Sequence, residues 1–400
     1  MRRMLSFFSV LLFALVGLSL SSCGSDTSSF VGPRFQPVYF DGTRIYGGIG
    51  TACLSYVSTV SGVCAPMCTN PECTHKFTET KCEARPNCTL DVLTITGDGN
   101  IIVSGIDRND SFTTSTVMIN TKTGKQKYIL KQYPGSLNAM TVVGNNLYFL
   151  SKSKNSGSEN NGEHAVFFVP LKGGEAKQLE LPGNDYYFSG ADTNYLYLFD
   201  RYNRSILAVD YHNNHEYHTI YSLDKSQAKD CYIVGDTIYT FTDSERIKVT
   251  PKNNTEEDIQ AEDAAREYTL FSLSRRNIST GEILAKSEAK YINTPWGYIT
   301  DKYIYLPHFE PEIDYVVSSP SEGQNPYPTH KNTGIDIIDS DTLEVLETVD
   351  TPGIDISAIA YADENIMVFY CARHMAETEF CMGWYDRSTG KVNVYNIDSY

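Results

Sequence analysis

The sequence predicts an all-β fold, a seven-bladed β-propeller in which each blade consists of four antiparallel strands. Three observations support this prediction. A turn-and-strand phrase recurs along the 400-residue chain, a second type of turn follows many of its copies, and the chain contains 28 tyrosines and 18 phenylalanines. Aromatic residues favour strands, and they are large enough to fill the wedges between blades.

The recurring phrase is a turn containing Gly, Asp or Asn, followed by a short strand rich in aromatic or β-branched residues. Its copies are spaced by roughly 40 to 65 residues, which matches the period of propeller blades. Seven copies can be aligned, and they begin at Asp41, Gly97, Gly144, Asp192, Gly235, Thr300 and Asp363. The alternative folds for such a repeat are a large sandwich and a solenoid.

A second tight turn begins with Asn or Asp and ends with Gly, as at Asn120, Asn277 and Asp386. The Asx side chain initiates such a turn, and Gly supplies the positive φ angle. Each unit therefore contains strand A, a tight turn, strand B, a loop, strand C, a tight turn and strand D. The predicted blades span residues 36–88, 89–134, 135–182, 183–227, 228–288, 289–351 and 352–399.

The two faces of this propeller are expected to differ. We call the face with the A–B and C–D turns the tight-turn face, and the face with the B–C loops and D–A links the loop-rich face. Polar loops elaborated on one side indicate a binding surface, and tolerated drift in exposed loops is the alternative. A short helix is expected at residues 259–268. The B–C loops expected to be long are residues 107–114, 152–164, 250–268, 307–332 and 373–379.

The first 22 residues have the pattern of an export signal. Arg2 and Arg3 precede an apolar segment, residues 5–20, which is shorter than the roughly 20 residues of a membrane-spanning helix. The segment ends in Leu-Ser-Ser-Cys23, which resembles the lipobox of bacterial lipoproteins. That resemblance implies cleavage before Cys23 and lipid attachment to it. An ordinary secretory signal is the alternative.

We therefore predict a signal peptide at residues 1–22, a lipidated flexible tether at 23–35 and the propeller at 36–400. The formal net charge is −16, and removal of Arg2 and Arg3 leaves −18. An acidic chain without a basic cluster argues against nucleic acid and anionic lipid as partners. The expected location is the cell envelope, with the chain held outside the cytoplasm by lipid on the cytoplasmic or outer membrane.

The chain has ten cysteines, and nine remain if Cys23 carries lipid. Most of them lie in a Cys/His module at residues 64–88. The phrase Cys68-x4-Cys73-x-His75-x6-Cys82 resembles a module found after the first blade in uncharacterised exported β-propeller lipoproteins of anaerobic bacteria. This resemblance implies the fold and no particular activity.

The module has three chemical interpretations. Cys68, Cys73, His75 and Cys82 have the composition of a Cys3His zinc site, although the x4 spacing is unusual for zinc. Disulfides that involve Cys53, Cys64 or Cys88 are the second interpretation, because an exported compartment permits them. A thiolate nucleophile activated by His75 is the third, and no group that would orient His75 is evident.

A separate pair of cysteines, Cys371 and Cys381, is expected in the last blade. A hairpin symmetric about Ala376 places them directly opposite each other, at the loop-rich end of strands B and C. Opposed Cβ atoms lie about 4.5 to 5.5 Å apart, close to the distance that a disulfide requires. The pair is therefore predicted to be bonded in an oxidising compartment, with Cys231 as the thiol that remains.

These features predict a binding or scaffolding propeller that recognises a protein, peptide or glycan ligand through its loop-rich face. The first alternative is a propeller hydrolase or lyase that acts on glycan or peptide. The second, by analogy of fold alone, is a factor in envelope assembly. No G-x-S-x-G, H-E-x-x-H or phosphate-binding glycine loop occurs in the sequence. We therefore assign no catalytic residue.

Overall fold

The structure, a computed structural model, describes residues 38–47, 53–68, 70, 72–73, 82–152, 164–183, 185–223, 230–249, 266–292, 297–308, 313–315, 328–330, 334–374 and 378–396. These residues form strands and turns and contain no helix. In the described ranges, accordingly, no helix is long and apolar enough to cross a membrane.

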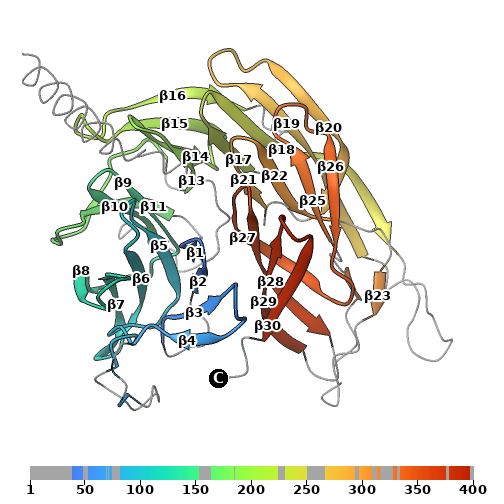
Figure 1. Cartoon of the computed structure of the whole chain (residues 1–400). Coiled ribbons are helices and arrows are strands. Elements are labelled where there is room, and N and C mark those ends of the chain that lie inside the picture. The colour runs from blue at the N-terminus through green and yellow to red at the C-terminus, as the bar shows by residue number, and fades with distance from the viewer. Residues whose placement is uncertain are drawn as a thin grey trace, which may run out of the picture.

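Seven four-stranded antiparallel sheets are arranged in a ring, which confirms the predicted seven-bladed propeller (Figure 1). Each sheet is built from consecutive strands, apart from the insertion in blade 6. The strands of the first four blades are, in blade 1, β1 (Tyr39–Phe40), β2 (Arg44–Gly47), β3 (Ser55–Ser58) and β4 (Cys64–Pro66); in blade 2, β5 (Val92–Ile95), β6 (Ile101–Asp107), β7 (Asp110–Ile119) and β8 (Gln126–Tyr133); in blade 3, β9 (Ala139–Val143), β10 (Asn146–Lys152), β11 (His164–Pro170) and β12 (Lys177–Gln178); in blade 4, β13 (Tyr186–Ala191), β14 (Tyr195–Asp200), β15 (Ser205–Asp210) and β16 (Tyr217–Ser222).

The remaining blades follow the same order, and blade 6 carries an additional hairpin in its B–C loop. Their strands are, in blade 5, β17 (Asp230–Val234), β18 (Thr237–Val249), β19 (Arg266–Asn277) and β20 (Ile283–Ile292); in blade 6, β21 (Tyr298–Ile299), β22 (Tyr303–Pro307), β25 (Gly334–Asp339) and β26 (Val345–Asp350), with the inserted hairpin β23 (Ile313–Tyr315) and β24 (Pro328–His330); in blade 7, β27 (Asp355–Ala362), β28 (Ile366–His374), β29 (Thr378–Asp386) and β30 (Lys391–Asn396). The first strands of neighbouring blades contact one another around the centre of the ring, as β5 and β9, β13 and β17, and β21 and β27 do (Figure 1).

Apolar side chains fill the wedges between neighbouring blades. Because successive side chains of a strand point to opposite faces, one strand places side chains in the wedges on both sides of its blade. Tyr148 packs between blades 3 and 4, and the adjacent Phe149 packs between blades 2 and 3. A wedge cluster joins blades 7 and 1 as well, where Val368 and Trp384 pack with Ile45 and Val57. The ring therefore closes by packing, since no strand is exchanged between the first and last described sheets.

The predicted tight turns are present and are stabilised by Asp and Asn side chains. At the A–B turn of blade 1, the Asp41 carboxylate accepts hydrogen bonds from the Thr43 and Arg44 backbone N–H groups and from the Tyr46 hydroxyl, at 3.0, 2.8 and 2.7 Å. Asp192 repeats this arrangement in blade 4 with Tyr197. In these two copies the recurring phrase is thus a local turn whose Asp also holds the aromatic residue of the following strand.

Some expected boundaries are wrong. The loop expected at 107–114 is a tight turn, since β7 begins at Asp110 and pairs with β6. The hairpin at 373–379 continues its pairing to His374 and Thr378. Blade 5 extends past residue 288, because β20 ends at Ile292.

The helix expected at 259–268 is wrong at its C-terminal end, where Arg266–Tyr268 belong to strand β19. Residues 259–265 lie outside the described residues. The polar composition of residues 107–114 and 373–379 suggested long loops. In the structure, the backbone N–H and C=O groups of these segments are instead satisfied by pairing within hairpins.

Candidate metal centre and loop-rich face

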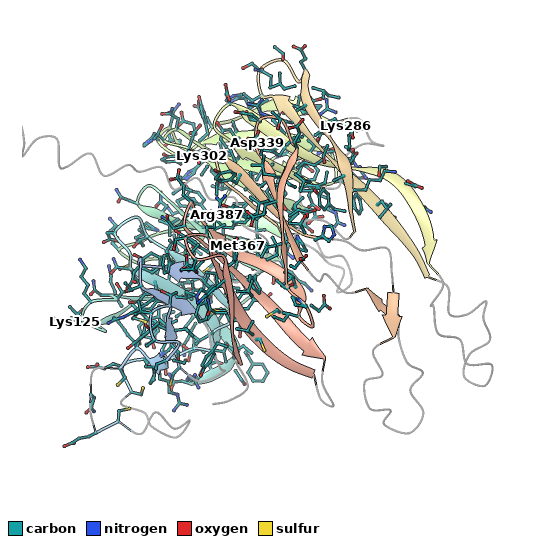
Figure 2. The ribbon with its side chains drawn as sticks, turned by 45° about the vertical axis from the view of Figure 1, so that its right-hand side comes forward. Lys125, Lys286, Lys302, Asp339, Met367 and Arg387 are labelled. Atoms are coloured by element: carbon teal, nitrogen blue, oxygen red, sulfur yellow. The ribbon has the colours of Figure 1, made fainter. Side chains whose placement is uncertain are left out.

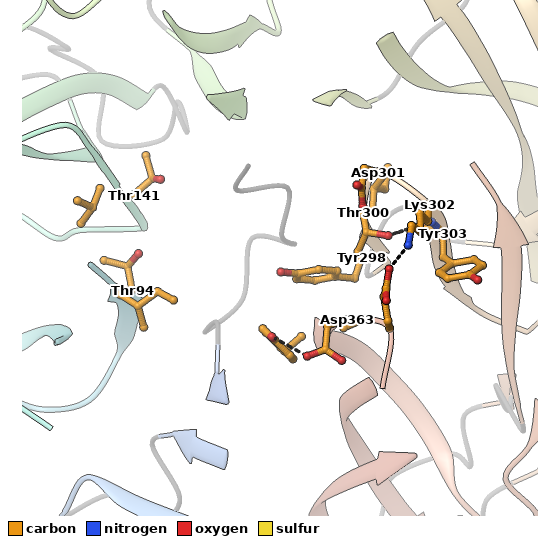
Figure 3. Close-up of a pocket in the computed structure, with 14 residues that line it drawn as sticks. Thr94, Thr141, Tyr298, Thr300, Asp301, Lys302, Tyr303 and Asp363 are labelled. Atoms are coloured by element: carbon orange, nitrogen blue, oxygen red, sulfur yellow. Dashed lines mark hydrogen bonds and ion pairs between the residues drawn. The ribbon is translucent and has the colours of Figure 1, made fainter. Parts of the chain in front are cut away.

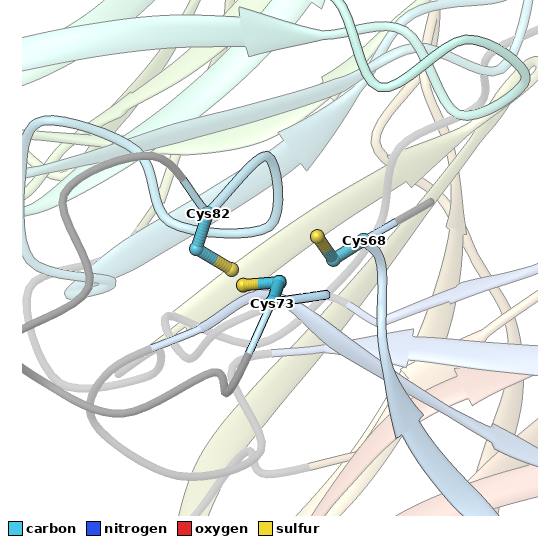
Figure 4. Close-up of side chains that lie close together, drawn as sticks. All are labelled: Cys68, Cys73 and Cys82. Carbon is cyan, nitrogen blue, oxygen red and sulfur yellow. The ribbon is translucent and has the colours of Figure 1, made fainter. Parts of the chain in front are cut away.

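Three thiols of the Cys/His module lie together at the loop-rich face, between blades 1 and 2. The sulfur atoms of Cys68, Cys73 and Cys82 are all within 4.8 Å of one another. Figure 4 shows the three side chains pointing toward a common region. In a tetrahedral zinc site with Zn–S bonds of about 2.3 Å, the sulfur atoms are roughly 3.8 Å apart. These three residues, which we call the three-cysteine cluster, could hold a metal ion.

The backbone brings the cysteines together through Leu54. The Leu54 N–H donates to the Ala84 carbonyl at 2.8 Å, and the Leu54 carbonyl accepts from the Met67 N–H at 2.9 Å. Leu54 and Ala84 are fully buried. The B–C loop of blade 1, the end of its strand D and the segment after Cys82 are therefore held at one point, and this places Cys68 close to Cys82.

The unusual spacing between Cys68 and Cys73 is accommodated by a turn that begins at Asn70. The Asn70 side-chain oxygen accepts the Glu72 N–H at 3.0 Å, and the Asn70 carbonyl accepts the Cys73 N–H at 3.2 Å. An Asx turn of this kind reverses the chain within four residues. The Cys73 thiol is thereby returned toward Cys68, so the four-residue gap does not prevent the two sulfur atoms from meeting.

Backbone N–H groups point at two of the sulfur atoms. Burial raises the pKa of the Cys68 thiol, but the N–H groups of Asn70 and Glu83 donate to its sulfur, and the net pKa is lowered. Burial and the hydrogen bond with Cys73 raise the pKa of Cys82, which the N–H of Ala84 partly offsets. Hydrogen bonds to the charged form favour the thiolate. By composition, three thiols, which zinc binds as thiolates, are a donor set that fits a metal ion.

The structure separates the other cysteines of this region. Cys88 is buried in the wedge between blades 1 and 2, while Cys64 is buried in the wedge between blades 7 and 1. Blade 1 thus stands between these two disulfide candidates. Cys53 lies beside the three-cysteine cluster, with its sulfur 4.0 Å from that of Cys82. Cys23 and His75 lie outside the described residues.

Cys371 and Cys381 are directly opposite in the β28–β29 pairing, as the sequence predicts. Both are buried near the loop-rich end of blade 7, and the Cys371 sulfur lies 3.6 Å from the Cys381 carbonyl oxygen. All nine cysteines of the described residues are thiols in this structure. The bond between Cys371 and Cys381 therefore stays a prediction.

We expect equilibration with oxidised glutathione to join Cys371 to Cys381 and to stabilise the protein. A loop of about ten residues closed by a disulfide contributes about 2 to 3 kcal/mol in the chain-entropy model. Peptide mass mapping without reductant should find the two cysteine peptides linked, with a mass two hydrogen atoms lower. Cys231, which is also buried, serves as the control and should stay a thiol. Recovery of Cys371 and Cys381 as unlinked thiols after this treatment would contradict the prediction.

A cavity of about 330 Å³ lies near the centre of the ring at the tight-turn face (Figure 3). Thr94 and Thr141 line one side, and Tyr298, Tyr361 and Asp363 line the other. The Tyr361 hydroxyl donates to the Asp363 carboxylate at 3.1 Å. Burial, followed by the negative charge of Asp363, raises the pKa of Tyr298 to about 12, so this hydroxyl stays protonated. No sequence pattern singled out this cavity, because its lining residues come from four blades.

The loop-rich face carries two projecting hairpins on adjacent blades. Strands β18 and β19 have 13 and 12 residues, whereas the inner strand β17 of the same blade has five. The inserted hairpin β23–β24 belongs to blade 6. Figure 2 shows the ends of these hairpins on the lower right, opposite Lys125, Lys302 and Asp339. Lys125, Lys302 and Asp339 belong to turns of the tight-turn face. Two of the five loops expected to be long thus belong to hairpins that project on the same side, and residues 250–265 and 316–327 of these loops lie outside the described residues.

Comparison with known proteins identifies no family for this chain. No family model matches it. No curated protein matches it either.

Several solved structures resemble the fold at low sequence identity. A computationally designed protein, Ika8, is 12% identical, with a TM-score of 0.44 over 92% of this chain and 98% of that chain. An oligogalacturonate lyase from Vibrio parahaemolyticus is 13% identical, with a TM-score of 0.41 over 70% of each chain. An oligogalacturonate lyase in complex with manganese is 12% identical, with a TM-score of 0.42 over 70% of this chain and 72% of that chain. We therefore assign the fold of this chain from its own strand pairing and not from these similarities.

Proposed function

We propose that the chain is a lipid-anchored, exported propeller that binds a protein, peptide or glycan ligand through its loop-rich face. The observation that supports this most directly is the projection of the β18–β19 hairpin. β17 pairs with β18 only as far as Phe241, but β18 and β19 stay paired to Val249 and Arg266. Eight further residues at about 3.3 Å each extend the hairpin roughly 25 Å beyond that point.

Such a projection adds little to the core of the blade, because the exposed residues 244–246 of β18 lie beyond the inner strand. It also has an edge strand whose unpaired backbone groups can pair with another chain. The inserted hairpin β23–β24 of the next blade adds a second element on the same face. Two projecting hairpins on neighbouring blades form a surface suited to recognition, whereas the turns of the opposite face are short.

The metal enters this proposal as a structural element. We propose that the three-cysteine cluster binds zinc, and that the zinc orders the link between blades 1 and 2. A short segment without its own apolar core gains order from such a site, because metal binding contributes directly to folding free energy. The link lies on the loop-rich face, since it joins strand D of one blade to strand A of the next. The proposed ion has no part in catalysis.

Photo-crosslinking in the cells that produce the protein tests the binding function. A benzophenone amino acid replaces Arg246, an exposed residue of β18, in one variant and Lys125, an exposed residue of the tight-turn face, in the other. We expect a discrete adduct of defined mass from position 246 and none from position 125. The same adduct from both positions, or no adduct from position 246, would overturn the proposed binding surface.

A further inference from the structure

The three-cysteine cluster supplies three ligands, and a closed structural zinc site requires four. The sequence suggests His75 as the fourth ligand, because it lies two residues after Cys73. The structure contains another candidate. The Cys53 sulfur lies 4.0 Å from the Cys82 sulfur, close to the separation of about 3.8 Å between two ligands of one tetrahedral zinc ion. It is not among the three sulfur atoms that lie within 4.8 Å of one another, so zinc binding would draw the Cys53 side chain toward Cys68 and Cys73.

We infer that the Cys53 thiolate is the fourth ligand and that it completes an all-cysteine zinc site with the three-cysteine cluster. This inference rests on the proposed metal binding and is independent of the proposed binding surface. Cys53 comes from the B–C loop of blade 1, while the other three cysteines come from the link to blade 2. Zinc therefore fastens the loop of one blade to the segment that leads into the next.

The backbone around Leu54 holds Cys53 in place for this role. Leu54 is bonded on one side to Ala84, two residues after Cys82, and on the other to Met67, which precedes Cys68. Cys53 is the residue before Leu54, so its position is set by the same contacts that position two of the other ligands. Cys53 and Cys82 are both buried, with 8% and 4% of their surface exposed. Burial excludes water from that side of the site.

Positively charged side chains near Cys53 are suited to a site with four thiolates. A zinc ion with four thiolates carries a net charge of −2, and a buried charge requires compensation. The guanidinium groups of Arg85 and Arg108 lie near enough to Cys53 to interact with its sulfur electrostatically. The Arg108 side chain is itself held at this location, because its Nε donates to the Pro86 carbonyl at 3.1 Å. Two positive groups beside Cys53 offset the excess negative charge.

Cobalt binding distinguishes Cys53 from His75. The full-length chain, purified in detergent under reducing and anaerobic conditions and freed of metal, is titrated with Co²⁺ and then with competing Zn²⁺. The wild type should bind one ion per chain, with the thiolate-to-cobalt absorption of a four-thiolate site. Cys53→Ser should weaken this absorption and lower the affinity by more than about tenfold, because a ligand is lost. His75→Ala should change neither. Cys88→Ser controls for the loss of a nearby buried thiol.

The outcomes separate the two proposals. Loss of cobalt affinity in His75→Ala together with unchanged binding in Cys53→Ser would overturn the assignment of Cys53 and leave the metal site in place. A wild type that binds no ion under these reducing conditions would overturn both. If Cys53→Ser fails to fold, X-ray absorption of the zinc-loaded wild type decides the question. Four sulfur neighbours at about 2.3 Å support the inference, and three sulfurs with one nitrogen contradict it.

Discussion

Replacing Cys23 by alanine is expected to abolish membrane anchorage of the mature chain. The thioether to lipid cannot form without the thiol, so the variant should appear either as a soluble exported protein or as an uncleaved precursor. Two or three acyl chains hold a protein lastingly on a membrane, because each buried CH₂ contributes about 0.8 kcal/mol, whereas a single chain is marginal. Fractionation of the cells, followed by mass measurement of the amino-terminal peptide, distinguishes the two outcomes.

Ser22→Ala is the matched control, because it alters the neighbouring residue and leaves the thiol in place. That variant should fractionate with the membrane, as the wild type does. A Cys23→Ala chain that is found in the membrane fraction at the mature mass would show that the anchor lies elsewhere. The predicted export signal and tether would then need a different explanation.

Gly190→Ala is expected to destabilise the propeller strongly. Gly190 lies in β13 with φ at +154°, and a Cβ atom there would be 2.5 Å from the backbone carbonyl oxygen of Ile233 in β17. The inner strands of blades 4 and 5 therefore approach too closely for a side chain. Overpacking typically costs about 1 to 3 kcal/mol, and the φ angle adds about 1 kcal/mol more. The midpoint of chemical unfolding, followed by circular dichroism, should fall accordingly.

Gly174→Ala separates the steric effect from the backbone strain. Gly174 has a similar φ of +150°, but no atom lies within 4 Å of the position of its Cβ. The free energy of unfolding of this variant should fall only by the cost of the φ angle, about 1 kcal/mol. Equal shifts of the unfolding midpoint in the two variants would show that blades 4 and 5 can separate slightly without cost, and that the close approach is not needed for stability.

Features that depend on neighbouring residues in the chain are predictable from the sequence. The turn at Asp41 forms from contacts within five residues, and the opposition of Cys371 and Cys381 follows from one symmetric hairpin. The blade repeat is also local, because all four strands of a blade are consecutive in the chain or nearly so. The amino-terminal lipid signal depends only on a short sequence, and it stays a prediction because residues 1–37 lie outside the described residues.

Contacts between residues far apart in the chain could not be predicted from the sequence and are seen only in the tertiary structure. The sequence places Cys53 29 residues before Cys82, and only the bonds from Leu54 to Ala84 and Met67 bring the two thiols together. The same holds for the separation of Cys64 from Cys88, for the cavity at the tight-turn face and for ring closure between blades 7 and 1. Sequence periodicity reports which face of a strand is apolar, but neighbouring blades meet through shape-dependent packing, which a repeat pattern does not encode.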